Sequence, residues 1–157
     1  MIDNWVDRFD VTRRVRDACL CLHVQRAARA LARRFDNAFR PLALTNGQFS
    51  LLMSLNRPEP PTIGSVSQLL AMDRTTLTAN LKPLERRGLI EIAVDKADKR
   101  NRRLALTRKG RTLLEKAVPI WEREHAALDR LLEPSGPDAL RAQLRKLGAG
   151  YEKPKPR

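Results

Sequence analysis

A stretch of about thirty residues without glycine or proline is the strongest constraint on this chain. From Val11 to Arg40, apolar residues recur at spacings of three and four, which is the period of an α-helix. About 28 residues at a rise of ~1.5 Å span roughly 42 Å, longer than a typical globular helix. We therefore expect one continuous helix that packs against a partner along its length. Because aromatic residues make up only 4% of the chain, dimerisation is the expected way to enlarge the core.

Further helices are indicated by periodicity and by residues that begin and end helices. A second long helix is predicted from Thr107 or Lys109 to about Glu133, and a final one from about Pro137 to Leu147. Three short helices are predicted between the long ones, with Thr45, Thr62 and Asp73 as their N-caps. They cover about residues 46–56, 62–71 and 74–87.

The periodicity changes after Gly88. Residues 89–94 and 104–106 suit short strands, and the polar segment 95–102 separates them, so a β-hairpin is expected. Two short helices followed by a hairpin make a winged helix-turn-helix. The predicted class is mainly α, with about six helices and a two- to three-stranded wing, in an intertwined homodimer. Residues 11–42 and 108–148 are assigned to dimerisation, 45–107 to a DNA-binding lobe and 149–157 to a disordered basic tail.

The distribution of charge indicates a function for the winged segment. The chain carries a formal net charge of +13, and residues 62–111 hold twelve basic and five acidic residues. A field of this sign and size favours nucleic acid as partner, with a membrane surface second. The helix after Asp73 exposes short hydroxyls, an amide and cations, which are the groups that contact phosphates or base edges. The predicted DNA-binding residues are Arg74, Thr75, Thr76, Thr78, Asn80, Lys82, Arg86, Asp98, Lys99, Arg100, Arg102 and Arg103.

Three motifs resemble the MarR family of bacterial regulators. The wing of the family is resembled by the pattern Asp95-x-x-Asp98-x-Arg100-x-x-x-Leu104-x-Leu106-Thr107-x-x-Gly110. The end of its DNA-reading helix is resembled by Leu84-Glu85-Arg86-Arg87-Gly88-Leu89-Ile90. Its second helix is resembled by Leu44-Thr45-x-x-Gln48-Phe49. The similarity covers about residues 18–132. It implies a dimer whose terminal helices interlock and whose two lobes bind a near-palindromic operator, with repression as the family default.

The resemblance also implies roles for single residues. Arg100 is similar in position to the wing arginine that enters the minor groove, and Asp98 to the acid that orients a neighbouring arginine. Thr75, Thr76, Thr78 and Asn80 match positions that face the major groove. Lys82 and Arg86 are equally compatible with phosphate contacts and with simple solvation.

Family members usually release DNA when a small molecule enters a pocket between the dimerisation helices and the winged lobe. A small aromatic or amphipathic effector is therefore expected here, in a mostly apolar pocket with a few polar groups. The predicted lining is His23, Arg26, Phe39, Arg40, Phe49 and Met53. His23 is also typical of a core or interface histidine, and the phenylalanines and Met53 are more typical of plain core.

Cys21 supports an alternative function. It resembles in position the reactive cysteine of the organic-hydroperoxide-sensing branch of the family. The tyrosine positions that assist this thiol fall on Gln25, Phe35 and Asn46, none of which is a phenol. A thiol without a nearby cation or donor is a poor sensor, so packing is the favoured interpretation. On one helix, Cys19 and Cys21 would point to nearly opposite sides and should not pair.

Other classes of function find little support. No catalytic constellation, phosphate loop or metal-ligand spacing is present, so neither an enzyme nor a cofactor is expected. No 18-residue apolar run or signal peptide is found, and two cysteines without a disulfide framework suit a reducing cytoplasm. The remaining alternative is an architectural DNA-binding protein without sequence preference.

Overall fold

The computed structural model describes residues 5–132 and 136–149, which form seven α-helices, one 3₁₀ turn and a two-stranded antiparallel hairpin. The mainly helical winged-helix class is thereby confirmed. Residues 150–157 of the predicted tail lie outside the described residues, as does Ser135, which the sequence favours as the N-cap of the final helix. The elements are α1 (Trp5–Ala18), α2 (Leu20–Phe39), η1 (Arg40–Leu42), α3 (Asn46–Leu55), α4 (Ile63–Leu69), α5 (Arg74–Arg86), β1 (Ile90–Val94), β2 (Arg102–Leu106), α6 (Arg108–Leu131) and α7 (Pro137–Ala149).

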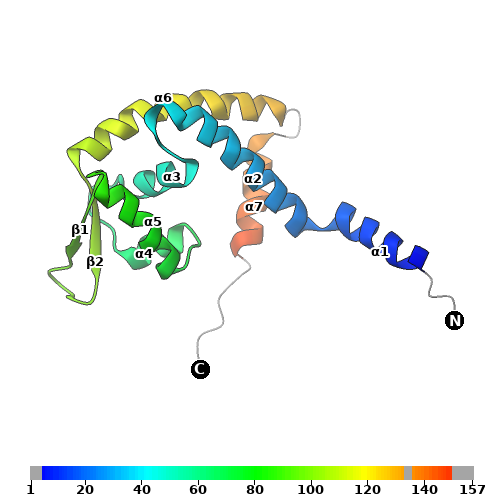
Figure 1. The fold of residues 1–157 in the computed structure, drawn as a ribbon, viewed down its shortest axis with the longest axis horizontal. Coiled ribbons are helices and arrows are strands. Elements are labelled where there is room, and N and C mark those ends of the chain that lie inside the picture. The colour runs from blue at the N-terminus through cyan, green and yellow to red at the C-terminus, as the bar shows by residue number, and fades with distance from the viewer. Residues whose placement is uncertain (1–4, 133–135, 150–157) are drawn as a thin grey trace.

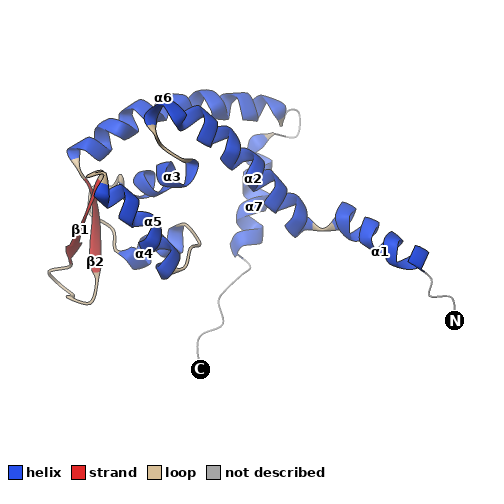
Figure 2. Ribbon diagram, viewed as in Figure 1, coloured by secondary structure: helices blue, strands red, loops and turns tan. Residues whose placement is uncertain are grey.

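The short elements gather in one lobe beneath the long helices. Figure 1 shows α3, α4 and α5 together with the hairpin under the first half of α6, while α2 runs beside α6 and α1 extends away from the rest. The hairpin projects at the edge of the lobe farthest from α1 (Figure 2). No helix in the described ranges is long and apolar enough to cross a membrane.

The single helix predicted over 11–40 is wrong, because the chain breaks between Ala18 and Leu20. Cys19 has an extended backbone (φ −75°, ψ 106°) and acts as the N-cap of α2, where its Sγ accepts from the backbone N–H of Leu22 at 3.5 Å. His23 Nε2 lies 3.0 Å from the carbonyl oxygen of Asp17 in the turn before the break. Cys19 and Cys21 therefore do not share one helix, and the argument that they point apart does not apply.

Apolar side chains from every element of the lobe meet in one core. Leu52, Leu77, Leu81, Leu84 and Leu104 are fully buried. An aromatic stack continues this core toward the long helices: the rings of Phe39 on α2 and Phe49 on α3 lie 4.8 Å apart between centroids. The core therefore joins the lobe to α2 and α6.

Side-chain caps begin the short helices where the sequence predicts. Thr45 and Gln48 form a reciprocal capping box on α3, Thr62 accepts from the backbone N–H of Ser65, and Asp73 caps α5. Gly88 follows α5 with a φ of +66°, a conformation that glycine adopts without strain. Both α5 and α6 continue through their internal prolines, Pro83 and Pro119.

The start of α6 is fixed on the turn between α5 and β1. The Thr107 hydroxyl donates to the carbonyl oxygen of Gly88 at 2.7 Å, and the Thr107 backbone N–H donates to that of Leu89 at 3.1 Å. A Cβ on Gly110 would lie 2.1 Å from the Leu89 carbonyl oxygen, so only glycine allows this approach. The junction thus sets how the lobe is attached to the longest helix.

Replacing Gly110 with alanine should destabilise the protein, because the backbone on both sides of the clash has to move. We expect the free energy of unfolding in urea to fall by about 2–3 kcal/mol. Gly47→Ala is the matched control, because no atom lies within 4 Å of its added methyl group and it sits in the first turn of α3. Equal stability of the two variants would contradict the packing described for the junction.

Candidate nucleic-acid interface

Helix α5 separates a buried leucine face from an exposed polar face. Leu77, Leu81 and Leu84 have no exposed surface and anchor the helix in the lobe. Thr75 and Lys82 lie on the opposite side and are exposed, as are Arg74, Thr76, Thr78, Asn80 and Arg86. All seven residues predicted on this helix are therefore accessible to a partner.

Several of these side chains also form hydrogen bonds that stabilise the first turns of α5. Asp73 Oδ1 accepts from the Thr76 backbone N–H at 2.8 Å, and Oδ2 accepts from the Thr76 hydroxyl at 2.6 Å. These bonds, the side-chain one first, keep the pKa of Asp73 below its usual value. The Thr78 hydroxyl donates to the Arg74 carbonyl oxygen at 2.7 Å. Thr76 and Thr78 thus offer a partner mainly their oxygen lone pairs and methyl groups.

The wing pairs Ile90 with Leu106 at its base and Val94 with Arg102 near its tip. Just beyond Val94, Asp95 is a buried acid that holds the loop. Its carboxylate accepts from the Ala97 backbone N–H at 3.0 Å and from Arg103 Nε at 2.7 Å. Arg103 also donates to the carbonyl oxygen of Pro60 at 3.0 Å, so this guanidinium ties the wing to the connector before α4. Arg103 thus has two contacts within the lobe, and the DNA contact expected of it stays a prediction.

The role predicted for Asp98 differs from the one in the structure. Its carboxylate accepts from the Arg100 backbone N–H and from the Asn101 side-chain amide, each at 3.0 Å. Asp95 is the acid that binds a neighbouring guanidinium. Asp98 instead shapes the tip of the loop, where Lys99 and Arg100 are exposed.

The six residues predicted to line an effector pocket are not brought together within one chain. Phe39 and Phe49 are core residues in ring contact, whereas Met53 is 38% exposed. His23 precedes Phe39 by sixteen residues on α2, which corresponds to about 24 Å. Arg26 and Arg40 are both exposed, and Arg40 donates to the Asn37 side chain. Phe39 and Phe49 remain together, Arg40 directly follows Phe39, and His23 and Arg26 lie toward the other end of α2.

Trp121 and His125 complete the aromatic stack and were not singled out from the sequence. The His125 ring lies 4.1 Å from that of Trp121 and 5.0 Å from that of Phe35, between centroids. Burial lowers the pKa of His125, and its Nδ1 is buried without a hydrogen-bond partner among the described residues. In the sequence, Trp121 and His125 are spaced by one helical turn, which indicates that they share a face of a helix. Their ring partners Phe35 and Phe49 lie on α2 and α3, so this spacing alone could not identify the stack.

Comparison with known proteins places this geometry in one family. The model of the MarR family matches residues 44–101. The organic hydroperoxide resistance transcriptional regulator of Bacillus subtilis is 32% identical over 101 residues, which make up 64% of this chain and 69% of that protein.

Solved structures extend the similarity over the helices outside the lobe. The M. tuberculosis transcriptional regulator MosR in complex with DNA is 36% identical, with a TM-score of 0.76 over 84% of this chain and 95% of that one. The transcriptional repressor CouR bound to p-coumaroyl-CoA is 27% identical, with a TM-score of 0.75 over 87% of this chain and 96% of that one.

The buried carboxylate of Asp95 should make stability depend on pH. Its pKa is held low, first by the Ala97 backbone N–H and then by Arg103, so it stabilises the fold above the unfolded value of about 3.9. That contribution is lost as the pH falls through the lower, folded value. In urea titrations, we expect Asp95→Asn to be less stable than wild type at pH 7, with a smaller difference at pH 3. Asp98→Asn, which removes an exposed carboxylate, is the control, and a constant Asp95→Asn deficit at both pH values would contradict this role.

Proposed function

This chain belongs to the MarR family of winged helix-turn-helix transcriptional regulators, and we propose that it is a dimeric repressor. In this proposal it binds a near-palindromic operator and releases it when a small molecule binds. The observation that carries the proposal is the division of α5 into a fully buried leucine face and an exposed face of hydroxyls and cations. Short polar side chains on a rigid helix suit the edges of bases in the major groove.

The wing supplies the second contact. Lys99 and Arg100 are exposed at the tip of a loop that Asp95 and Asp98 hold in shape from within. An arginine presented on such a loop suits the narrow, electronegative minor groove beside the major groove that α5 would occupy. Arg102, Lys82 and Arg86 are exposed cations that we assign to the phosphates.

Dimerisation is supported by the apolar residues that the single chain leaves uncovered. Most of them lie on α1, α2, α6 and α7 rather than on the lobe, and Leu20 and Leu131 are 63% and 73% exposed. Patches of this kind mark protein–protein interfaces. The set comprises Phe9, Val11, Val15, Leu20, Val24 and Leu31 on α1 and α2, and Leu131, Leu140, Leu144 and Leu147 on α6 and α7.

The aromatic stack is our candidate for the effector response. It lies where α3 of the lobe meets α2 and α6, so a ligand that separated these rings would change how the lobe is held. Trp121 is 37% exposed, and the buried Nδ1 of His125 has no hydrogen-bond partner among the described residues, which suits an aromatic ligand with a hydrogen-bonding group. CouR, which has the same fold, is bound to p-coumaroyl-CoA.

Operator binding tests the proposal directly. In fluorescence anisotropy with a palindrome from the gene's own promoter, we expect Arg100→Ala to weaken binding about tenfold and to lower the salt slope by about one. Arg29→Ala on α2 removes the same charge far from the lobe and should have little effect. Titration well above the dissociation constant should saturate at two chains per duplex. Equal binding to the palindrome and to random DNA would favour the architectural role instead.

A thiol-based response is the second candidate, because Cys21 is exposed and a relative is an organic hydroperoxide resistance regulator. In this reaction the Cys21 sulfur attacks the peroxide oxygen, forming a sulfenic acid and releasing the alcohol.

Peroxide treatment followed by thiol mass spectrometry separates the two candidates. If the thiol responds, Cys21 gains one oxygen or a disulfide at doses that abolish operator binding, and Cys21→Ser stays bound. Cys19→Ser is the control for the neighbouring thiol. An unmodified Cys21 at doses that release DNA would exclude the thiol-based response.

A further inference from the structure

The exposed face of α5 carries methyl groups at its centre. Thr75 and Ala79 are both exposed, and a spacing of four residues places them one above the other on the same face of the helix. Ala79 lies midway in sequence between the buried Leu77 and Leu81, so its side chain points to the opposite side of the helix. In the first two turns of α5, the centre of the exposed face therefore presents methyl groups rather than charge.

The hydrogen-bond donors beside these methyl groups are used within the protein. The Thr76 hydroxyl donates at 2.6 Å to the carboxylate that caps the helix, and the Thr78 hydroxyl donates at 2.7 Å to the Arg74 carbonyl oxygen. One N–H of the Asn80 amide donates to Met72 Sδ at 3.6 Å. A hydroxyl has a single hydrogen, so Thr76 and Thr78 keep only oxygen lone pairs for a partner.

The cations of α5 lie outside this region. A Cβ added to Gly64 would meet Arg74 Nη2 at 3.1 Å, so the Arg74 guanidinium lies against α4. Lys82 and Arg86 belong to the second half of the helix. The N-terminal residues of a reading helix are the ones that meet base edges. The first two turns of α5 therefore offer bases few donors and no cation directed outward.

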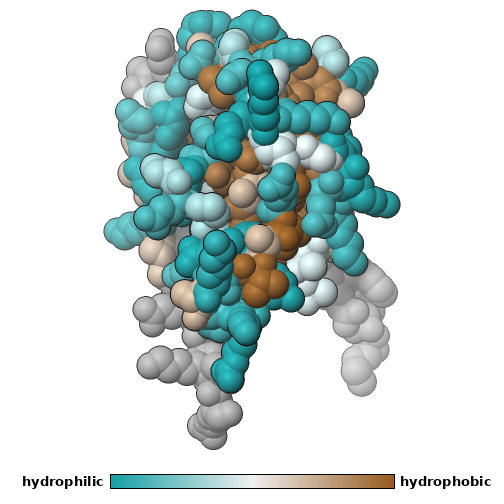
Figure 3. Space-filling model, turned by 90° about the vertical axis from the view of Figure 1, so that its left-hand side faces the viewer, coloured by the Kyte–Doolittle hydropathy of each residue, from teal (hydrophilic) through white to brown (hydrophobic). Residues whose placement is uncertain are grey.

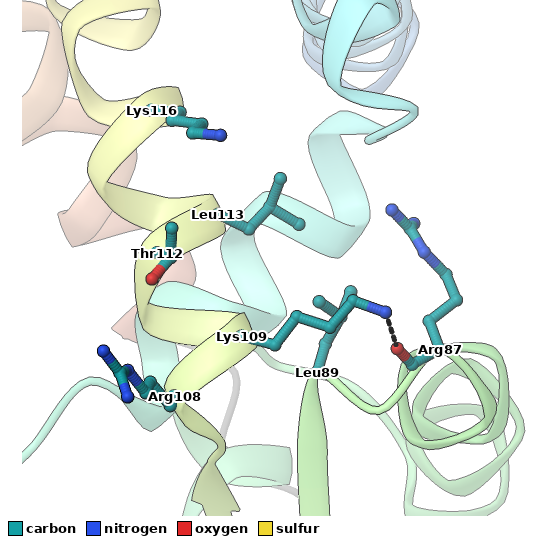
Figure 4. A pocket seen from close by; sticks show the side chains of 7 residues that line it. All are labelled: Arg87, Leu89, Arg108, Lys109, Thr112, Leu113 and Lys116. Carbon is teal, nitrogen blue, oxygen red and sulfur yellow. Dashed lines mark hydrogen bonds between the residues drawn. The ribbon is translucent and has the colours of Figure 1, made fainter.

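Further positive charge gathers at the opposite end of α5. Arg87 follows this helix about 20 Å from Asp73, and Lys109 on α6 donates to its carbonyl oxygen there (Figure 4). Figure 3 shows hydrophilic side chains projecting over much of the hairpin side of the molecule. Charged groups of this kind contact phosphates, which position a protein on DNA but carry no direct sequence information. Discrimination between bases then depends on the first two turns of α5.

The chemistry of these turns matches one kind of base pair. In the major groove guanine offers two acceptors, N7 and O6, whose usual partner is arginine or lysine, whereas thymine offers a methyl group and adenine an N6 donor. We propose that Thr75 and Ala79 select A·T pairs by contact with thymine methyl groups, while the Thr76 and Thr78 oxygens accept from adenine N6. This inference rests on the proposed operator binding and adds the base preference of each half-site.

Selection from a library of random duplexes, followed by a base-analogue substitution, tests the preference. The selected duplex is made again with deoxyuridine in place of each thymine of its half-sites, which removes only the C5 methyl groups. We expect half-sites rich in A·T pairs and about tenfold weaker binding of the uracil duplex in fluorescence anisotropy, since each buried methyl group contributes a factor of about four. Deoxyuridine placed outside the half-sites is the control for the DNA and should change the affinity little.

Variants of α5 connect the preference to the two methyl groups. The measured quantity is the ratio of the dissociation constants of the uracil and thymine duplexes, in which a general loss of helix stability cancels. We expect Thr75→Ser combined with Ala79→Gly to lower this ratio from about ten to about two. Thr75→Val, which keeps a methyl group and removes the hydroxyl, should keep the wild-type ratio. The control is Thr112→Ser, which removes an exposed methyl group from α6, outside the reading helix (Figure 4).

Two results would contradict the base preference while leaving operator binding intact. One is a selected site whose half-sites consist mainly of G·C pairs. The other is the same ratio of dissociation constants in wild type and in the double variant, because the thymine methyl groups would then be sensed elsewhere. A selection that enriches no sequence would instead overturn operator binding itself, and the base preference with it.

Discussion

The attachment of α6 to the turn after α5 is the contact on which the rest of the structure depends. The carbonyl oxygen of Arg87 accepts from Lys109, that of Gly88 from the Thr107 hydroxyl, and that of Leu89 from the Thr107 backbone N–H. Gly110 has no side chain, so the backbones of α6 and of this turn can approach closely. The reading helix, the wing and the longest helix all converge there. Because α6 is hydrogen-bonded directly to the turn after α5, a movement of α6 relative to the lobe would also change the orientation of α5 and its exposed face.

Buried leucines and a buried carboxylate hold the elements that carry the lobe's positively charged surface. Fully buried leucines fix α5, and Asp95 holds the wing loop through one backbone bond and one guanidinium. Cations that repel one another can then gather on the surface, because none of them has to hold the fold. Arg103 is one exception, since its bonds to Asp95 and the Pro60 carbonyl tie the wing to the connector. Lys109 and Arg87 are others, since they donate to the backbone carbonyl oxygens of Arg87 and Ala43.

Sequence reasoning found what short-range patterns determine. Helix caps at Thr45, Thr62 and Asp73 and the positive φ of Gly88 follow from local chemistry, and the structure contains them all. The break at Cys19 was missed because no glycine or proline marks it. Asp98 was expected to bind a neighbouring arginine, but Asp95 binds Arg103 instead, because the backbone of the loop decides which carboxylate meets this guanidinium. The pairing of His125 with Phe35 depends on two helices ninety residues apart in sequence.

Helix length connects these local features to the proposed reading of DNA. Helix α6 has 24 residues, so it extends about 36 Å from the lobe to the uncovered leucines near its end. Half-sites one helical turn apart are separated by about 34 Å. A dimer joined at the far ends of α6 and α7 would hold its lobes by two such rigid arms. Because each arm starts at the Gly110 junction, a small rotation there would be amplified over the length of the helix, and the separation of the reading helices would change more than either lobe does internally.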